Sequence, residues 1–332
     1  MILITGGAGY IGSHTALNFL NSGFETVIFD SLEKGHIETV NMLQNEGKLH
    51  FVKGDLKNPD DIKGVFEQFD IDAVIHFAGY IEVEESVREP EKYYVNNVLG
   101  SKNLLDAMTA HNVKKIVFSS TCAVYGEPEY LPLDENHPRN PVNPYGRTKM
   151  QIEDMLKEYD EKYGLKSVIL RYFNASGADS RARTGEWHTP ETHLIPNILK
   201  SVLNKGRTFK IFGTDYDTID GTCVRDYVNV EDMALAHKKA YEYLKSSNKS
   251  NVFNIGTASG YSVKQVFETA EKITGKKISF ETAPRRAGDA AKLTADTKKA
   301  SEVLGWRAEK SLADSIKTAY EWEKKLNKTR IF

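Results

Sequence analysis

The chain has 332 residues and a net charge of −2, with 40% hydrophobic and 27% charged residues, which is ordinary for one large α/β domain or two unequal lobes. Such a small charge produces no strong field, which disfavours nucleic acid and membrane surfaces as partners. Cys122 and Cys223 make no disulfide framework and fit a reducing cytoplasm, while the chain shows neither a signal-peptide pattern nor a run approaching the ~20 apolar residues of a membrane span.

In the first half of the chain, short apolar runs alternate with segments of helical periodicity. The runs expected to form strands are Met1–Thr5, Glu25–Asp30, Leu49–Lys53, Ala73–Phe77, Lys115–Ser119 and Ser167–Tyr172. Helical periodicity lies between them, at Gly12–Ser22, Asp60–Phe69 and Tyr93–His111. This alternation predicts right-handed crossovers and a parallel sheet covered on both faces, which is the doubly wound Rossmann α/β architecture.

The first predicted strand leads directly into a glycine-rich turn that opens a helix. The glycines of this turn are Gly6, Gly9 and Gly12. The first permits a tight turn, the second lets a pyrophosphate approach the backbone, and the third lets helix and strand pack closely. Because the start of a helix also offers free N–H groups and a positive dipole end, the turn predicts a dinucleotide site.

Two aspartates follow predicted strands next to this turn. Asp30 ends the second strand, where its carboxylate is placed to accept hydrogen bonds from the adenosine ribose and to repel a 2′-phosphate. The expected cofactor is therefore NAD rather than NADP. Asp55 follows the third strand and has two interpretations, either as a partner of the adenine amino group or as the N-cap of the next helix.

Tyr145 and Lys149 lie one helical turn apart and form the predicted catalytic pair. The lysine ammonium favours the phenolate, so it should lower the tyrosine pKa from ~10 toward neutrality and make the phenolate a general base. The same spacing recurs at Tyr241 and Lys245 and at Tyr320 and Lys324. Only the first pair lies in the dinucleotide-binding half, after a strand that ends in small hydroxyl residues. We interpret the other two pairs as solvated helix faces.

After Asn174 the pattern changes to a polar loop followed by mixed elements. The expected elements are helices near Leu194–Asn204, Glu231–Leu244, Val263–Thr274 and after Ser311, and strands near Phe209–Phe212 and Asp226–Val230. We therefore expect an NAD-binding domain at 1–175 and a smaller substrate-binding lobe at 176–332. His188 and His193 match no metalloprotease pattern, so we assign no metal.

Eight segments form a combined pattern along nearly the whole chain. They are TGGAGYIGSH, HFAG, YYVNN, FSSTCAVYG, NPYGRTK, RYFNASG, RDYVNVED and APRRAGD. In this order and spacing they resemble the UDP-glucose 4-epimerases of the extended short-chain dehydrogenase/reductase family. The resemblance implies bound NAD, a UDP-hexose such as UDP-galactose as substrate, inversion of the 4-hydroxyl, and a homodimer formed through the two long helices that carry Asn96 and Tyr145.

The resemblance also implies roles for individual residues. Tyr145 is the base, Lys149 is its partner on the nicotinamide ribose, and Thr121 stands where the family has a serine. The remaining NAD contacts are implied at Tyr10, Ile11, Asp30, Asp55, Leu56, Phe77, Ala78, Gly79, Asn96 and Phe173. Substrate contacts, besides Thr121 and Tyr145, are implied at Asn174, His193, Leu194, Lys210, Ile211, Phe212, Arg225, Arg286, Asp289 and Leu293. Arg225 and Arg286 suit a pyrophosphate because a guanidinium is a fixed fork of donors.

Two positions depart from the family pattern. Ile81 stands where family members often carry a lysine, two residues after the HFAG motif. Leu293 stands where members restricted to UDP-glucose and UDP-galactose often carry a tyrosine beside the sugar's 2-position. The shorter leucine predicts room for an N-acetyl group, unless neighbouring side chains refill the space.

Other functions on the same fold stay open. A sugar-nucleotide 4,6-dehydratase or decarboxylase needs an acidic residue just after the catalytic hydroxyl, whereas this chain has Cys122 and Ala123 there. A reductase that releases its product would more naturally use NADPH, which Asp30 disfavours. A non-catalytic NAD-sensing protein is also compatible with the fold, but it would need no Tyr145, Lys149 and Thr121.

Overall fold

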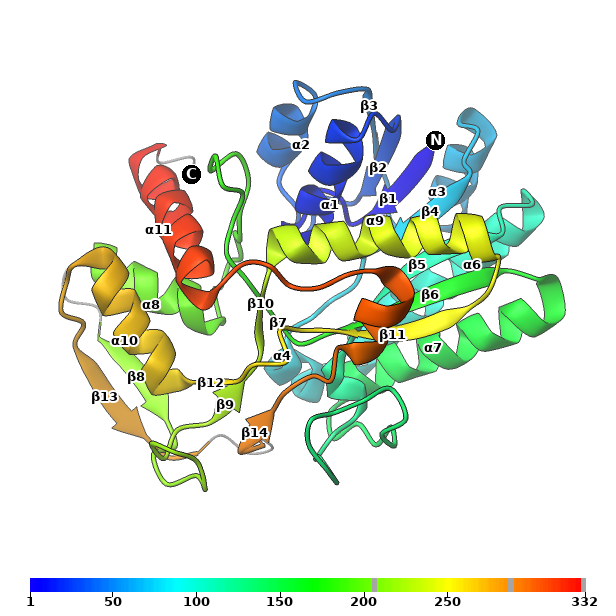
Figure 1. Cartoon of the computed structure of the whole chain (residues 1–332). Coiled ribbons are helices and arrows are strands. Elements are labelled where there is room, and N and C mark those ends of the chain that lie inside the picture. Colours follow the sequence, from blue (N-terminus) through cyan, green and yellow to red (C-terminus); the bar gives the residue numbers. More distant parts are fainter. Residues whose placement is uncertain (205–207, 286–289, 330–332) are drawn as a thin grey trace.

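The computed structural model describes residues 1–204, 208–285 and 290–329. A seven-stranded parallel sheet forms its larger part, on the right in Figure 1, with the strand order β11–β6–β5–β4–β1–β2–β3. Its strands are β1 (Ile2–Thr5), β2 (Thr26–Asp30), β3 (Leu49–Lys53), β4 (Ala73–His76), β5 (Lys115–Thr121), β6 (Lys166–Tyr172) and β11 (Asn251–Ile255). The doubly wound α/β fold predicted from the sequence is therefore confirmed.

Helices cover both faces of this sheet, which is why its central strands are almost continuously apolar. One face packs against α1 (Tyr10–Asn21) and α9 (Val230–Ser247), with α2 (Ile37–Leu43) beside α1. The opposite face packs against α3 (Pro59–Gln68), α6 (Gly100–Ala110) and α7 (Pro144–Tyr163). Strand order reverses between β1 and β4, and in a sheet of this kind ligands bind in the crevice at the carboxyl ends of the strands next to that point.

The chain returns to the large sheet after it has entered the smaller lobe. Helix α9 lies across the sheet in Figure 1, and β11 pairs with β6 as an additional strand. Both elements follow residue 175 in the chain but belong to the large sheet. The predicted boundary between 1–175 and 176–332 therefore does not hold for α9 and β11. The short apolar run of β11 did not stand out as a strand in the sequence, because its partner lies far away along the chain.

The described part of the smaller lobe, on the left in Figure 1, consists of helices and short strands. Its helices are α8 (Leu194–Leu203), α10 (Val263–Thr274) and α11 (Leu312–Thr329). Its strands form the pairs β8 (Phe209–Phe212) with β13 (Phe280–Ala283) and β7 (Asn174–Ser176) with β10 (Tyr227–Asn229), and the group β12 (Tyr261–Ser262), β9 (Val224–Arg225) and β14 (Lys292–Leu293). Buried side chains such as Ile198, Leu199, Val266, Phe267 and Ile316 join the helices into one core.

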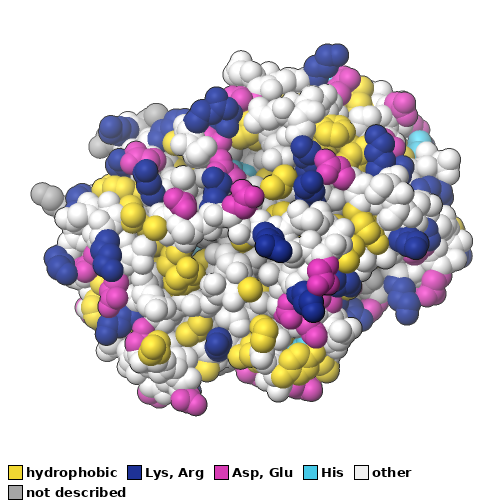
Figure 2. All heavy atoms as spheres, in the orientation of Figure 1, with side chains coloured by type: hydrophobic (Ala, Val, Ile, Leu, Met, Phe, Trp, Pro, Cys, Tyr) yellow, Lys and Arg dark blue, Asp and Glu magenta, His cyan; other side chains and the backbone are white. Residues whose placement is uncertain are grey.

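Short helical segments complete the large part. They are α4 (Val83–Arg88), α5 (Pro90–Tyr93), a π-helical segment at Tyr94–Leu99, the 3₁₀ turn Cys122–Val124 and a second π-helical segment at Ala300–Leu304. The helix expected at Tyr93–His111 thus begins with a π-helical segment and continues as α6. Over the described ranges, none of the helices combines the length and hydrophobicity needed to cross a membrane. On the face shown in Figure 2, basic and acidic side chains are interspersed, as the small net charge suggests.

Candidate active site

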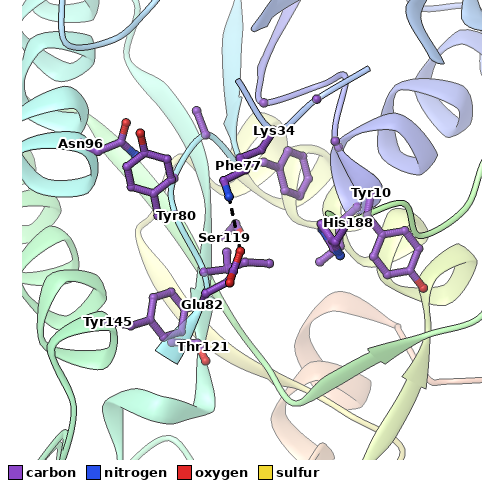
Figure 3. A pocket seen from close by; sticks show the side chains of 18 of the residues that line it. Tyr10, Lys34, Phe77, Tyr80, Glu82, Asn96, Ser119, Thr121, Tyr145 and His188 are labelled. Carbon is purple, nitrogen blue, oxygen red and sulfur yellow. Dashed lines mark hydrogen bonds and ion pairs between the residues drawn. The ribbon is translucent and has the colours of Figure 1, made fainter. Parts of the chain in front are cut away.

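A cavity of about 440 Å³ lies at the carboxyl ends of the parallel strands, next to the point where their order reverses. This volume is within the usual range of small-molecule sites. Its walls come from the segments that follow β1 to β6 and from the loop before α8 (Figure 3). Every residue predicted to contact NAD lies in the lining: Gly6, Gly9, Tyr10, Ile11, Gly12, Asp30, Asp55, Leu56, Phe77, Ala78, Gly79, Asn96, Tyr145, Lys149 and Phe173.

The three glycines of the turn are needed for different reasons. The fold itself requires glycine at two of these positions, whereas the third glycine leaves space for a ligand. Gly6 has φ +72°, and a Cβ there would lie 2.7 Å from the backbone nitrogen of Ala78. A Cβ on Gly12 would lie 2.2 Å from the carbonyl oxygen of Gly6. Gly9 has an ordinary φ of −86°, and its Cβ would meet protein atoms no closer than 3.4 Å. Since Gly9 lines the cavity, its missing side chain fits the close approach of a pyrophosphate to the backbone.

Asp30 is held rigidly at the end of β2. Its carboxylate accepts hydrogen bonds from the backbone N–H groups of Ala8 at 3.0 Å and Leu32 at 2.9 Å. Burial raises the pKa of this carboxyl, and the two hydrogen bonds oppose the shift. The side chain is thus oriented in the wall where a ribose of NAD would lie, and these residues fit the cofactor.

The structure decides between the two interpretations of Asp55 only in part. Helix α3 is capped by Asn58, which accepts from the backbone N–H of Asp60, so Asp55 is not the N-cap. Its carboxylate accepts instead from the backbone N–H of Lys57 at 2.8 Å. Asp55 also lines the cavity, which leaves the adenine contact as a prediction.

Ile81 lines the cavity where the family often has lysine, and a different lysine lies nearby. Lys34, from the segment after β2, pairs with Glu82 across the cavity at 3.4 Å (Figure 3). Both side chains belong to the cavity lining. A cation is therefore present at this wall although position 81 is apolar.

The start of α7 places Tyr145 against the end of β5. Asn143 caps the helix by accepting from the backbone N–H of Gly146 at 2.8 Å. A Cβ on Gly146 would lie 2.6 Å from the carbonyl oxygen of Ala123, so only glycine lets the helix start approach this segment so closely. The approach brings the Tyr145 phenol close to Thr121, and both side chains face the cavity in Figure 3.

Lys149 lies one turn further along α7 and is almost fully buried. Its ammonium donates a hydrogen bond to the carbonyl oxygen of Ser119 at 2.8 Å and lies 6.0 Å from the centre of the Tyr145 ring. Burial lowers the pKa of Lys149 to about 8, and the nearby carboxylate of Glu153 opposes this. Burial also raises the pKa of the Tyr145 phenol, although the neighbouring hydroxyl of Thr121 opposes the rise. The expectation that Lys149 lowers the tyrosine pKa is therefore wrong for this arrangement, because its ammonium is turned toward a carbonyl.

A buried network behind the catalytic pair was missed from the sequence. Glu153 accepts from the hydroxyl of Ser120 at 2.6 Å and from Nη2 of Arg171 at 2.7 Å. Tyr172 lines the cavity and hydrogen-bonds His237, which is buried in α9. Glu153 could have been found from its spacing of four residues after Lys149, whereas the pairing of Tyr172 with His237 arises only from the tertiary fold.

Only some of the residues predicted to contact the substrate line the cavity. Thr121, Tyr145, Asn174 and His193 line the cavity. The lining does not include Leu194, Lys210, Ile211, Phe212, Arg225 and Leu293. Ile211 instead packs in a small core with Tyr216, and Arg225 donates to the carbonyl oxygen of Ala290 at 2.8 Å. Arg286 and Asp289 lie outside the described residues.

A parallel sheet with a glycine-rich turn after β1 and a tyrosine–lysine pair beside β5 defines a short-chain dehydrogenase/reductase of the extended class. The model of the GDP-mannose 4,6 dehydratase family matches residues 3–319, and the chain belongs to this family.

Individual relatives narrow the comparison to the UDP-glucose 4-epimerases. The chain is 47% identical to the UDP-glucose 4-epimerase of Halalkalibacterium halodurans, over 97% of this chain and 95% of that protein. It is similar to the structure of UDP-glucose-4-epimerase from Stenotrophomonas maltophila with bound NAD and formylated UDP-arabinopyranose, with a TM-score of 0.96, 36% identity and 99% of both chains covered. It is also similar to the UDP-Glc/GlcNAc 4-epimerase of Campylobacter jejuni, with a TM-score of 0.86, 41% identity and 98% and 99% of the two chains covered.

Proposed function

We propose that this protein is an NAD-dependent epimerase that interconverts UDP-glucose and UDP-galactose by inverting the 4-hydroxyl of the sugar. The observation that carries the proposal is the placement of Tyr145, Lys149 and Thr121 together in the lining of the cavity that the glycine turn also lines. Membership of the family and the high identity to named UDP-glucose 4-epimerases support it.

When bound, NAD accepts a hydride from C4 of the sugar and returns it to the opposite face. The residues of this chain handle the proton. Tyr145 takes the proton of the 4-hydroxyl and later returns it, and the hydroxyl of Thr121, which lines the same cavity, would relay the proton between phenol and substrate. Lys149 places a buried cation on the same side of the site.

The substrate must be held by its UDP part, because the sugar has to present both faces of C4. Asn174 and His193 line the cavity on the side of the smaller lobe. We assign the pyrophosphate to Arg225 and Arg286 and the uridine ribose to Asp289, as the family pattern implies. Lys210, Ile211 and Phe212 would have to meet the uracil at the edge of the cavity. A loosely held sugar and firmly held phosphates are what this reaction requires.

Elimination or decarboxylation is disfavoured by the residue that follows Thr121. Such reactions need a further acid or base at that position. Burial raises the pKa of the Cys122 thiol to about 12, so Cys122 stays protonated near neutral pH and is no substitute for a carboxylic acid. An NAD-sensing protein is disfavoured by the intact arrangement of Tyr145, Lys149 and Thr121 at one cavity.

The substrate range is proposed to include UDP-N-acetylglucosamine. Leu293 packs on a cluster that contains Phe173, and Phe173 lines the cavity. A leucine there leaves more space than the tyrosine that family members restricted to the unmodified hexoses often carry. The similarity to the UDP-Glc/GlcNAc 4-epimerase of Campylobacter jejuni supports this range.

We further propose that the protein is a cytoplasmic homodimer. Large apolar side chains are exposed on the segments between β4 and α6, among them Val87 at 61%, Tyr94 at 43% and Leu99 at 38%. These segments pack beside α7, so the exposed residues lie next to the two helices through which the family pairs. Clustered apolar exposure is typical of a surface covered by a partner.

The proposed function is tested by incubating purified protein with UDP-glucose, without added NAD, and measuring UDP-galactose. We expect conversion to an equilibrium mixture, because NAD is regenerated in every turnover and should copurify. Conversion that requires stoichiometric added NAD, or release of a dehydrated or decarboxylated product, would contradict the proposal.

A further inference from the structure

Four side chains that the proposed reaction does not use as a group meet in the loop before α8. They are Glu186, His188, Glu191 and His193, and one potential ligand atom from each lies within 4.8 Å of all the others. The Nδ1 atom of His193 lies 2.8 Å from Oε1 of Glu186 and 2.9 Å from Oε1 of Glu191. The Nδ1 atom of His188 lies 3.3 Å from the same Glu186 oxygen.

These distances suit a common metal ligand sphere. Zinc binds histidine nitrogen at 2.0–2.1 Å and carboxylate oxygen at 2.0–2.2 Å, so neighbouring ligand atoms around a tetrahedral ion lie about 3.4 Å apart. The separations of Nδ1 of His188 from the Glu186 and Glu191 oxygens, 3.3 Å and 4.0 Å, bracket this value, whereas Nδ1 of His193 lies closer to Glu186, at 2.8 Å. Both imidazoles present the same nitrogen, Nδ1, to the two carboxylates. Two imidazoles and two carboxylates are a donor set typical of divalent first-row transition metals.

Two atoms of the cluster lack hydrogen-bond partners within the described part of the chain. They are Nδ1 of His188 and Oε2 of Glu191. The Glu191 side chain is only 3% exposed, and its Oε2 lies 4.0 Å from Nδ1 of His188. Buried polar atoms are nearly always satisfied by a hydrogen bond or an ion. Their charged neighbours lie at 3.3 Å or more, and the two atoms lie 4.0 Å apart, so one ion between them would satisfy both.

The buried carboxylates of the cluster also need positive charge beside them, which either protonated histidines or a bound cation would supply. The side chains of Glu186 and Glu191 are 8% and 3% exposed, so two carboxylates are withdrawn from water side by side. Lys200 approaches Oε2 of Glu191 only to 3.7 Å. Buried charges are stable only when they are paired or bound to a metal. A divalent ion bound by two neutral histidines would neutralise both carboxylates.

The loop that carries the cluster joins three separate parts of the molecule. The ring of His36, from the segment after β2, stacks on Trp187 at 3.7 Å, and Trp322 of α11 donates to the carbonyl oxygen of Glu186 at 2.9 Å. The same loop supplies Glu186, His188 and His193 to the wall of the cavity. An ion here would fix the loop in the position that closes one side of the active site.

We propose that Glu186, His188, Glu191 and His193 form a structural binding site for one divalent transition-metal ion, and Zn²⁺ is the ion that we expect there. The ion takes no part in the epimerisation. It fastens the loop before α8 against α11 and the segment after β2. The site does not depend on the proposed function, and it revises the assignment of no metal made from the sequence.

The test is a titration of Zn²⁺ into chelator-treated, untagged full-length protein, with a chromophoric chelator as competitor. We expect one tightly bound ion per chain. Glu191→Gln keeps the size of the side chain, and His188→Ala removes one imidazole. Each variant should weaken binding at least 10–100-fold, the loss typical when even an outer partner of a metal site is removed. His50→Ala serves as the control, because it removes a histidine of β3 that pairs with Glu25 and not with a residue of the cluster, and it should bind Zn²⁺ as the wild type does.

Thermal unfolding supplies a second readout that does not depend on activity. Zn²⁺ should raise the melting temperature of the wild type and of His50→Ala, but not that of Glu191→Gln or His188→Ala. If either variant fails to fold, the stoichiometry of the wild type and the visible spectrum of its Co²⁺ form still decide the question. Less than one ion per chain in the wild type, or equal binding by wild type and variants, would overturn the proposal and leave the cluster as a set of histidine–glutamate ion pairs.

Discussion

At the scale of single residues, the environment of each site residue matters more than its type. Tyr145 and Lys149 have the spacing that suggested mutual activation, but Lys149 donates to the carbonyl oxygen of Ser119 and burial dominates the pKa of the phenol. The pKa of the Tyr145 phenol is therefore set by its burial rather than by the tyrosine–lysine spacing alone.

Lys149 makes folding depend on pH in a defined direction. Lysine titrates near 10.4 in an unfolded chain, whereas burial lowers the pKa of Lys149 to about 8 in the folded protein. Between these values the unfolded chain binds more protons, so this residue makes stability rise with pH in that window. Lys149→Met removes the buried charge, and its stability relative to the wild type should therefore fall as the pH rises from 8 to 10. Urea unfolding at several pH values measures this. Lys157→Met, at an exposed site on the same helix, is the control, and a pH-independent difference for Lys149→Met would refute the argument.

Asp30 should set the choice between the two nicotinamide cofactors. Asp30→Asn keeps the size of the side chain and removes the negative charge that opposes a 2′-phosphate. We expect weaker binding of NAD and a smaller preference for NAD over NADP, measured by titrating both dinucleotides into cofactor-free protein. Equal loss of affinity for both would mean that Asp30 only holds the turn through Ala8 and Leu32.

At the scale of elements, the contact between the start of α7 and the end of β5 creates the catalytic arrangement. Gly146→Ala introduces a Cβ that would lie 2.6 Å from the carbonyl oxygen of Ala123, so the helix start must move away and Tyr145 must separate from Thr121. Displacements of about 1 Å can cost on the order of 100-fold in rate, and we expect a fall in kcat of this size with NAD still bound. Gly64→Ala in α3 is the control, because its Cβ meets nothing within 4 Å. Unchanged kcat in Gly146→Ala would show that the close approach is unnecessary.

Strand β14 should set the substrate range through Leu293, which pairs in register with Arg225 of β9. A tyrosine at 293 would extend toward the cluster behind Phe173 and fill space that an N-acetyl group needs. Leu293→Tyr should therefore keep turnover of UDP-galactose and lose that of UDP-N-acetylgalactosamine. Assays of both sugars with wild type and variant decide this. If the wild type has no activity on the N-acetyl sugar, the proposal of a wider substrate range is wrong, whereas the assignment as a 4-epimerase still holds.

At the scale of the whole molecule, the elements that have a local sequence pattern could be predicted from the sequence. The elements and clusters that depend on partners far away along the chain could not. The central strands and the glycine turn follow from apolar runs and backbone constraints, and the structure has them at nearly the predicted bounds. Strand β11 is recognisable only once β6 lies beside it. The cluster of Glu186, His188, Glu191 and His193 likewise exists only because an irregular loop folds back on itself, and no helical or strand period marks it.

The central claim is that Tyr145 performs the proton transfer of a 4-epimerase, and one measurement tests it most directly. The rate of UDP-galactose formation from UDP-glucose should be compared between the wild type, Tyr145→Phe and Tyr320→Phe, with bound NAD quantified in each protein. Tyr320 belongs to another tyrosine–lysine pair outside the cavity lining, so its variant should match the wild type. Tyr145→Phe should retain NAD and its fold but lose roughly 10²–10⁴-fold in rate, the usual contribution of a positioned general base. A near-normal rate in Tyr145→Phe, or no epimerisation by the wild type, would contradict the account.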